Sequence, residues 1–328
     1  MKRLILPLFM LFLLFCCYSC KEKEPVFPVV KHLIAEKVKA ENTGVARISI
    51  YKDLLIVTPM GSFTDNTIDV YSWPDIVFLY SMGTKGRGPG EVSQSATLLQ
   101  SNNSDYMYVK GISSPLNIRK FAIDSTRRLL PVSDYSIGRF PSSMSKPFLI
   151  NDSLYISDDF AVKIVEKYDI INQNPLGEIK YATEESESSI DMDWGIMLAN
   201  GSEISYIYSF RPEIYVYDIN TLKLTRKIKL KSKEIPLSPD KMNPYYIYLD
   251  AFAGEKYYYL LYMGDYLDNY HPSISQIEVY DHDWNPVIKY TFDIAPTTFV
   301  VDEDRGLILS SNYVSDDTDH FLIYDMNR

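Results

Sequence analysis

The chain has 328 residues, of which 46% are hydrophobic and 14% aromatic, and its formal net charge is −10. This composition excludes collagen-like chains, low-complexity disorder and polytopic membrane proteins. Because nucleic-acid binders carry a basic surface, the acidic balance also argues against nucleic acid as a partner. The 27 tyrosines and 15 phenylalanines favour strands over helices, so we expect an all-β protein.

The amino terminus has the anatomy of an export signal. Lys2 and Arg3 precede an apolar run over residues 4–15, which has the length of a secretory signal and is too short to span a bilayer. All three cysteines, Cys16, Cys17 and Cys20, lie at the end of that run. No cysteine remains downstream to form a disulfide or a thiolate metal site.

The residues around Cys20 resemble a bacterial lipoprotein cleavage site. Ser19 precedes the cysteine and four charged residues follow it, although Cys17 stands where such sites usually have an aliphatic residue. The resemblance implies a signal peptide over residues 1–19, lipidation of Cys20 and a lipidated tether over residues 20–31. The mature protein, with a net charge of 31 − 43 = −12, would be anchored at the outer membrane of a bacterial envelope, on its periplasmic face or at the cell surface. The alternative is an ordinary cleaved signal with an incidental cysteine.

A six-fold repeat runs through the rest of the chain. Its mark is an apolar residue followed three positions later by an aromatic residue, and often next by aspartate. The aromatic positions are separated by 50, 47, 49, 63 and 44 residues, which suits four-stranded propeller blades. The marks are Ile68 with Tyr71, Ile118 with Phe121, Val165 with Tyr168, Ile214 with Tyr217, Ile277 with Tyr280, and Phe321 with Tyr324.

Strand-like runs surround each mark in the same order. A second strand lies upstream of the mark, a polar turn precedes that strand, and an apolar run before the turn predicts an inner strand. Fourth strands follow the marks, for example at residues 76–80 and 224–228. The expected second strands are residues 54–57, 106–109, 154–157, 204–208, 257–262 and 307–309.

The last mark leaves no room for a fourth strand before Arg328. Because an exposed sheet edge invites aggregation, we expect the run from Leu33 to Val38 to complete the last blade. The segment from Glu184 to Leu198 is compatible with a short helix. The sequence therefore predicts one all-β domain over residues 32–328, a six-bladed β-propeller of four-stranded antiparallel blades whose ring is closed by an N-terminal strand.

The only glycine cluster of the chain lies at residues 83–91, between the first two blades. It fits neither the phosphate-loop pattern nor the dinucleotide fingerprint, so no nucleotide cofactor is expected. The cluster is similar to the link that opens an NHL repeat, and more closely to the single copy in TolB-like six-bladed propeller lipoproteins of bacterial envelopes. This resemblance implies an envelope-tethered propeller without a defined reaction. The alternative is that the glycines only permit a tight link between blades.

Candidate ligand-binding residues gather on one face of the predicted propeller, where the inter-blade loops emerge. The arginines among them come from three blades, and a guanidinium fork suits carboxylates, so we expect an acidic glycan, a peptide or a protein as ligand. The alternative is that each arginine pairs with a nearby carboxylate and holds loops together. The candidates are Lys85, Gly86, Arg87, Gly88, Arg139, Trp194 and Arg211.

We predict no catalytic or metal-binding residue and no cofactor. The four histidines lack metal-ligand spacing, and the chain has no nucleophile elbow. The acidic run at residues 302–306 aligns with the hairpin turns of the other blades, so a plain turn is expected instead of a calcium loop. The acidic residues at 316–319 are more open, and a solvated charge run is expected there, with a calcium site as the alternative.

These observations predict a non-enzymatic envelope lipoprotein that recognises a protein, an acidic glycan or a peptide. One alternative is a glycan or peptide hydrolase or lyase at the channel mouth, with or without a divalent ion, that uses carboxylates such as Asp158 or Asp191. Another is a scaffolding subunit of an envelope complex, which a large exposed apolar patch would indicate.

Overall fold

The computed structural model describes residues 25–39, 46–59, 66–84, 96–101, 105–111, 117–136, 147–159, 162–181, 193–230, 243, 245–266, 275–311 and 320–328. Within these ranges the chain forms 25 strands and no helix. No helix long and apolar enough to cross a membrane occurs in the same ranges. The all-β class expected from the aromatic content is confirmed.

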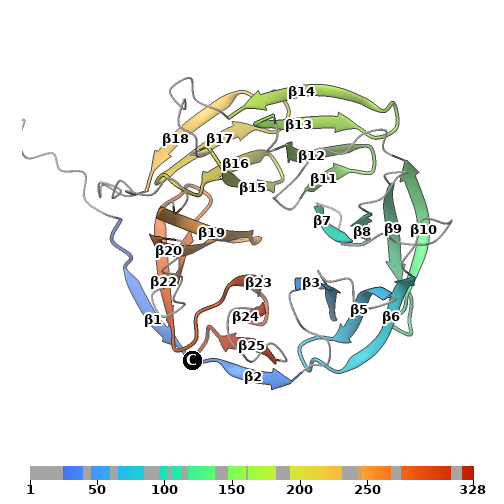
Figure 1. Cartoon of the computed structure of the whole chain (residues 1–328), viewed down its shortest axis with the longest axis horizontal. Coiled ribbons are helices and arrows are strands. Elements are labelled where there is room, and N and C mark those ends of the chain that lie inside the picture. Colours follow the sequence, from blue (N-terminus) through green and yellow to red (C-terminus); the bar gives the residue numbers. More distant parts are fainter. Residues whose placement is uncertain are drawn as a thin grey trace, which may run out of the picture.

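Antiparallel meanders of about four strands follow one another around a central axis, and in each the chain moves outward strand by strand (Figure 1). We number the meanders in chain order. Meander 1 comprises β3 (Ala46–Tyr51), β4 (Leu54–Pro59), β5 (Asn66–Ser72) and β6 (Phe78–Thr84). Meander 4 comprises β15 (Gly195–Asn200), β16 (Glu203–Tyr208), β17 (Glu213–Asp218) and β18 (Leu224–Lys229).

Meanders 2 and 3 form one eight-stranded sheet, because their inner strands pair in parallel over two residues, Phe148 with Gln100 and Leu149 with Ser101. Meander 2 comprises β7 (Thr97–Ser101), β8 (Met107–Lys110), β9 (Asn117–Ile123) and β10 (Leu129–Ser136). Meander 3 comprises β11 (Phe148–Asn151), β12 (Leu154–Asp159), β13 (Ile164–Asp169) and β14 (Asn174–Lys180).

The last two meanders each include a strand from the amino-terminal segment. Meander 5 comprises β19 (Tyr245–Ala253), β20 (Tyr258–Tyr266), β21 (Gln276–Tyr280) and β22 (Pro286–Phe292), and β1 (Val29–Leu33) adds to it in parallel with β22. Meander 6 comprises β23 (Thr298–Asp302), β24 (Leu307–Ser311) and β25 (His320–Asp325), and β2 (Glu36–Lys39) pairs antiparallel with β25 as its outer strand.

The amino-terminal segment differs in detail from the expectation. The run from Leu33 to Val38 is not one strand: Leu33 ends β1 on meander 5, and β2 on meander 6 begins at Glu36. The backbone N–H of Ala35, between the two strands, donates to Asp293 Oδ1 at 2.9 Å and fixes the crossing from one meander to the next. The expected tether is also shorter than residues 20–31, because Phe27 is 8% exposed and packs between meanders 4 and 5.

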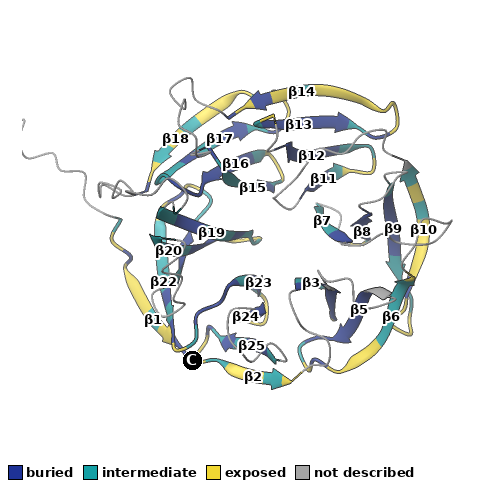
Figure 2. Ribbon diagram, viewed as in Figure 1, coloured by how far each residue is buried: buried dark blue, intermediate teal, exposed yellow. Residues whose placement is uncertain are grey.

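The core consists of six clusters of buried apolar side chains among the described residues, each of them between two neighbouring meanders. Figure 2 shows the consequence: the inner strands are largely buried, and exposed residues concentrate on the outer strands. From the first interface to the last, the clusters unite Ile68 with Phe121, Ile118 with Tyr168, Val165 with Tyr217, Ile214 with Tyr280, Ile277 with Tyr324, and Phe321 with Tyr71.

This pairing explains the spacing of the repeat. Residues three apart on a strand point to opposite faces of the sheet. The first residue of each mark therefore packs on the following meander, and its aromatic partner packs on the preceding one. The last cluster brings meander 6 against meander 1, where the rings of Tyr71 and Phe321 meet edge to face with centroids 6.2 Å apart.

The aspartates that follow several marks cap the next turn. Asp169 Oδ1 accepts hydrogen bonds from the backbone N–H groups of Ile171 and Asn172, both at 2.9 Å. Asp218 and Asp281 make the same kind of turn in meanders 4 and 5. A side-chain carboxylate that accepts from residues two to four positions on is the Asx-turn geometry.

The expected strand order is confirmed, with all six second strands present as β4, β8, β12, β16, β20 and β24. The helix considered between Glu184 and Leu198 is wrong in its described part, because Gly195–Asn200 is the inner strand β15. The stretch is a short run of apolar residues in an extended strand. Such a run does not distinguish a buried strand from a short buried helix by periodicity. Residues 182–192 lie outside the described ranges.

Candidate functional site

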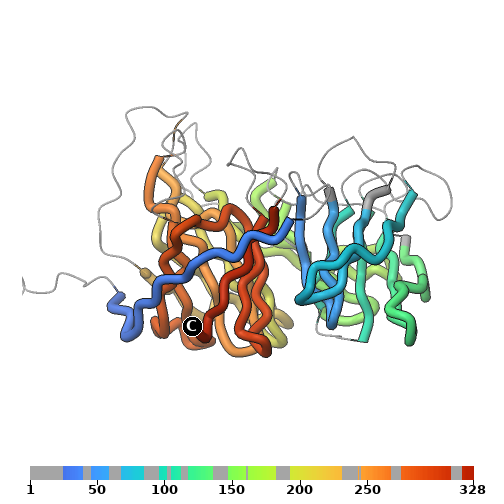
Figure 3. Tube along the Cα trace, turned by 90° about the horizontal axis from the view of Figure 1, so that it is seen from below, coloured from blue at the N-terminus to red at the C-terminus, as the bar shows by residue number. Residues whose placement is uncertain are grey.

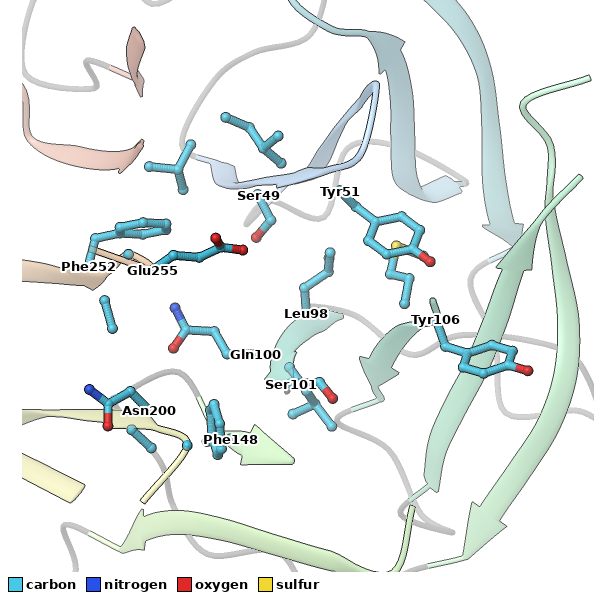
Figure 4. Close-up of a pocket in the computed structure, with 18 of the residues that line it drawn as sticks. Ser49, Tyr51, Leu98, Gln100, Ser101, Tyr106, Phe148, Asn200, Phe252 and Glu255 are labelled. Carbon is cyan, nitrogen blue, oxygen red and sulfur yellow. The ribbon is translucent and has the colours of Figure 1, made fainter. Parts of the chain in front are cut away.

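A pocket of about 810 Å³ lies on the axis of the ring, between the inner strands (Figure 4). The pocket lies at the end of the ring where hairpin turns join the first and second strands of the meanders. We call this end the hairpin-turn face. Figure 3 shows this face as the lower edge of the ring. We call the opposite end, from which inner strands start, the inter-blade face. The volume is in the range of small-molecule sites.

All six meanders contribute to the lining, so the pocket is a product of the ring and not of one local motif. Apolar walls come from Phe148, Phe252 and Val300 on the inner strands of meanders 3, 5 and 6. Polar groups come from the ends of the inner strands. The Ser49 hydroxyl, the Gln100 amide and the Glu255 carboxylate point into the same space (Figure 4).

Two polar atoms of the lining are buried and have no hydrogen-bond partner among the described residues. They are Tyr51 Oη and His282 Nε2. Burial, assisted by the nearby Asp105 and Tyr106, raises the pKa of Tyr51 to about 12, so the phenol stays neutral and can donate a hydrogen bond at ordinary pH. Both atoms are fully buried, so they lie beneath the surface of the pocket and do not face its open space.

The charges in the pocket are few and largely balanced. Glu203 Oε2 accepts from Arg226 Nη2 at 2.7 Å, which neutralises that carboxylate. Arg226 also donates to the backbone oxygen of His282 at 3.4 Å and ties meander 4 to meander 5. The remaining charges are the exposed Lys52 and Glu255 at the mouth. The pocket thus favours a neutral ligand with many hydrogen-bonding groups over a strongly charged one.

Of the residues predicted to bind a ligand, the structure describes Arg211 and Trp194. Both lie on the inter-blade face, and neither lines the pocket. The Arg211 guanidinium stacks 3.6 Å from the ring centroid of Tyr208 and lies 3.4 Å from Asp193 Oδ1 and 3.8 Å from Glu213 Oε2. Such contacts are expected under the alternative from the sequence, in which each arginine pairs with a nearby carboxylate and holds loops together. A role for Arg211 in ligand binding stays a prediction.

The other predicted site residues lie outside the described ranges, and their roles stay predictions. They are Cys20, Lys85, Gly86, Arg87, Gly88 and Arg139. The same holds for Asp191 and for the acidic residues at 316–319. Trp194 is described, and its ring centroid lies 6.4 Å from that of Phe210.

A buried charge cluster lies where β8 and β12 reach the inter-blade face. Asp158 is 1% exposed and Lys110 is 7% exposed. Burial lowers the pKa of Lys110 to about 8, with Arg47 acting in the same direction and Asp158 opposing it. Asp158 does not line the axial pocket, and its role as acid or base in the enzyme alternative stays a prediction.

The acidic run at residues 302–306 forms the hairpin turn between β23 and β24, as predicted. Asp302 accepts from the indole Nε1 of Trp73 at 2.6 Å and from Arg305 Nη1 at 2.9 Å. Arg305 Nη2 also contacts Asp53 Oδ1 at 2.7 Å. In the part of the chain that the structure describes, no group of three His, Cys, Asp or Glu side chains is placed to hold a metal ion.

The pocket residues were not predicted from the sequence. Ser49, Gln100, Asn200 and Glu255 belong to four meanders and share no local motif. One signal could have indicated them: each lies within two residues of the end of an inner strand, Ser49, Gln100 and Asn200 in the strand and Glu255 in the hairpin turn that follows it. The ends of the inner strands of a repeat converge on the axis of a ring.

No family model and no curated protein matches the chain. Solved structures do match. A member of the DUF4221 family from Bacteroides vulgatus has a TM-score of 0.59 at 13% identity, over 93% of this chain and 98% of that one. A protein of Bacteroides fragilis that is described as exported has a TM-score of 0.55 at 14% identity, over 90% and 98% of the two chains.

The β-propeller domain of Cps50 (Swd1) from Myceliophteria thermophila matches with a TM-score of 0.50 at 10% identity, over 89% of this chain and 99% of that domain. At such identities the likeness shows the fold alone. The chain is an all-β propeller with blades of about four antiparallel strands.

Proposed function

We propose that this chain is a six-bladed propeller lipoprotein of the bacterial envelope, held at the outer membrane by lipid on Cys20, which binds a ligand without transforming it. Each meander is one blade, and the eight-stranded sheet is two blades whose inner strands touch. The six interface clusters, the last of them between meanders 6 and 1, support the blade count. The export description of the Bacteroides fragilis protein agrees with the signal at residues 1–19.

The observation that carries ligand binding is the axial pocket, and its lining favours a short neutral glycan. Serine hydroxyls and primary amides each donate and accept hydrogen bonds, as sugar hydroxyls do. The aromatic side chains Tyr51, Tyr106, Phe148 and Phe252 offer apolar surface beside them. A few oriented polar groups on mainly apolar walls are the usual composition of a specific small-molecule site.

The ligand predicted from the sequence, an acidic glycan, a peptide or a protein on the inter-blade face, is the second candidate. Arg211 favours it by placing a guanidinium on that face, 21% exposed at the side chain, in an acidic protein. In this version Arg87 and Arg139 join Arg211 and bind a carboxylate. The two candidates differ in the face that is used and in the charge of the ligand.

A binding screen on residues 21–328 separates them. Neutral oligosaccharides, uronic-acid oligosaccharides and short peptides are compared by thermal shift, because a ligand that binds only the native state raises the melting temperature. We expect a shift with a neutral oligosaccharide. In titration calorimetry, Gln100→Ala should weaken that oligosaccharide at least tenfold, since it removes two donors and an acceptor.

Lys180→Ala is the matched control, because Lys180 is 77% exposed on the outer strand β14, away from the pocket. A shift with acidic ligands alone, lost in Arg87→Ala and unchanged in Gln100→Ala, would replace the first candidate by the second. No shift with any of the three classes would contradict small-ligand binding at either face.

A further inference from the structure

The charges of the outer strands are distributed unequally around the ring. The outer strands of meanders 4 to 6, β18, β1 and β2, carry six basic residues and one acidic residue. Those of meanders 1 to 3, β6, β10 and β14, carry one basic and two acidic residues. The basic residues are Lys31, Lys37, Lys39, Arg226, Lys227 and Lys229, and we call this part of the circumference the basic rim.

Most of these charges face solvent. Lys37, Lys39, Lys227 and Lys229 are exposed. Arg226 is engaged with Glu203, and Lys31 donates to the backbone oxygen of Met326 at 2.8 Å. In a mature chain of net charge 31 − 43 = −12, a rim with four exposed lysines is a local reversal of sign.

Exposed aliphatic side chains lie among these lysines, on the segment that contains β1. Val26, Val29, Val30 and Ile34 are 77%, 44%, 62% and 71% exposed. The neighbouring Phe27 is buried in the cluster between meanders 4 and 5, which also includes Leu230, directly after β18. The start of β1 and the end of β18 are therefore neighbours at the rim (Figure 1).

The chain length fixes which surface comes near the anchor. Phe27 is held in the core, and Cys20 precedes it by seven residues. Seven fully extended residues reach at most about 25 Å. If Cys20 carries the lipid, the headgroup plane must pass within that distance of Phe27, which lies beside the basic rim. The exposed apolar residue Val132, on β10, belongs to the opposite side of the ring from β1 (Figure 1).

We propose that the basic rim rests on anionic lipid headgroups of the membrane that anchors the protein. The lysines contact the headgroups, and the aliphatic side chains of the β1 segment insert among them. The ring then stands on its edge, and both ends of its axis open parallel to the membrane. This inference rests on the lipid anchor of the proposed function, and it adds the orientation.

The first test uses residues 21–328, without lipid, and vesicles of phosphatidylglycerol and phosphatidylethanolamine. We expect weak binding that is absent on phosphatidylcholine vesicles and abolished by 0.5 M salt, because Debye screening removes surface electrostatics. Lys227→Glu and Lys229→Glu should each lower the partition coefficient at least about fivefold. Lys180→Glu, on the outer strand β14 of meander 3 and outside the basic rim, is the matched control and should leave it unchanged.

The second test reads the orientation in the anchored protein. Because no cysteine follows Cys20, a single introduced cysteine can carry a fluorophore in the purified full-length lipoprotein. Nitroxide lipids should quench a label at Val30→Cys and spare one at Val132→Cys. Equal quenching at both positions, or none at position 30, would overturn the orientation. A chain that fails to enter the membrane fraction would instead contradict the anchor, which separates the two failures.

Discussion

At the scale of single residues, Asp302 holds the contact between the last meander and the first. Its carboxylate is 8% exposed and accepts from Trp73 of meander 1 and from Arg305 of its own turn. Burial alone would raise the pKa of this carboxyl, but the hydrogen bonds from Trp73 and Arg305 outweigh it, and the pKa is lowered. A charged acceptor shared by an indole and a guanidinium gives strong hydrogen bonds.

Asp302→Ala should lower the free energy of unfolding by about 2 to 3 kcal/mol, because it leaves the buried indole N–H of Trp73 without its acceptor. Urea unfolding followed by tryptophan fluorescence measures the change. Asp304→Ala, at an exposed position of the same turn, should stay within about 0.5 kcal/mol of the wild type. Equal effects of the two substitutions would show that the turn, and not the shared carboxylate, matters.

The pH dependence of Asp302→Asn follows from the sign of the pKa shift. Because the folded-state pKa lies below the ordinary value of 3.8, the charge of Asp302 stabilises the fold above that value. This contribution is lost as the pH falls through the folded-state pKa. The difference in unfolding free energy between wild type and Asp302→Asn should therefore be constant from pH 5 to 7 and shrink below pH 4. A difference that grows toward low pH would contradict the assignment.

Residue patterns explain what could be predicted and what could not. Marks such as Ile214 with Tyr217 are visible in the sequence because both faces of each third strand are buried, which demands apolar residues at fixed spacing. Pocket residues such as Gln100 form no such pattern. A ligand site requires a particular side chain at only one position of each meander, so no periodic signal appears in the sequence. The sequence does not indicate the parallel strand β1. Its valines Val29 and Val30 are both exposed, so apolar and polar residues do not alternate along it as they do in a half-buried strand.

At the scale of elements, the amino-terminal strands act as a brace across three meanders. Phe27 fills the interface of meanders 4 and 5, Leu33 fills that of meanders 5 and 6, and β2 covers the edge of β25. Deleting the brace would open the edges of β22 and β25 and empty both apolar positions. Unpaired edges invite association with other chains.

We predict that residues 40–328 are less stable than residues 25–328 by about 3 to 6 kcal/mol, the value of burying Phe27 and Leu33. Urea unfolding compares the two, and size-exclusion chromatography should show association of the shorter chain. Residues 25–328 should have the same unfolding midpoint as residues 21–328. Identical midpoints for residues 25–328 and 40–328 would show that β1 and β2 do not brace the ring.

At the scale of the whole molecule, ring closure brings residues of all six meanders together around the pocket. An open arc of meanders would leave β3 and β23 apart, and the lining contributed by meanders 1 and 6 would not meet. The cluster that joins these meanders includes Val300 and Leu309 beside the ring pair Tyr71 and Phe321. The pocket on the axis therefore depends on the packing of this cluster.

The most direct measurement of that closure is a double-mutant cycle between Tyr71 and Phe321, which lie at opposite ends of the repeat but touch edge to face. Urea unfolding of Tyr71→Leu, Phe321→Leu and the double variant should give a coupling energy of about 0.5 to 1.5 kcal/mol. The control cycle pairs Tyr71 with Tyr168 of meander 3, and its effects should add. Additive effects for Tyr71 and Phe321 would contradict the closed ring, and with it the pocket on its axis.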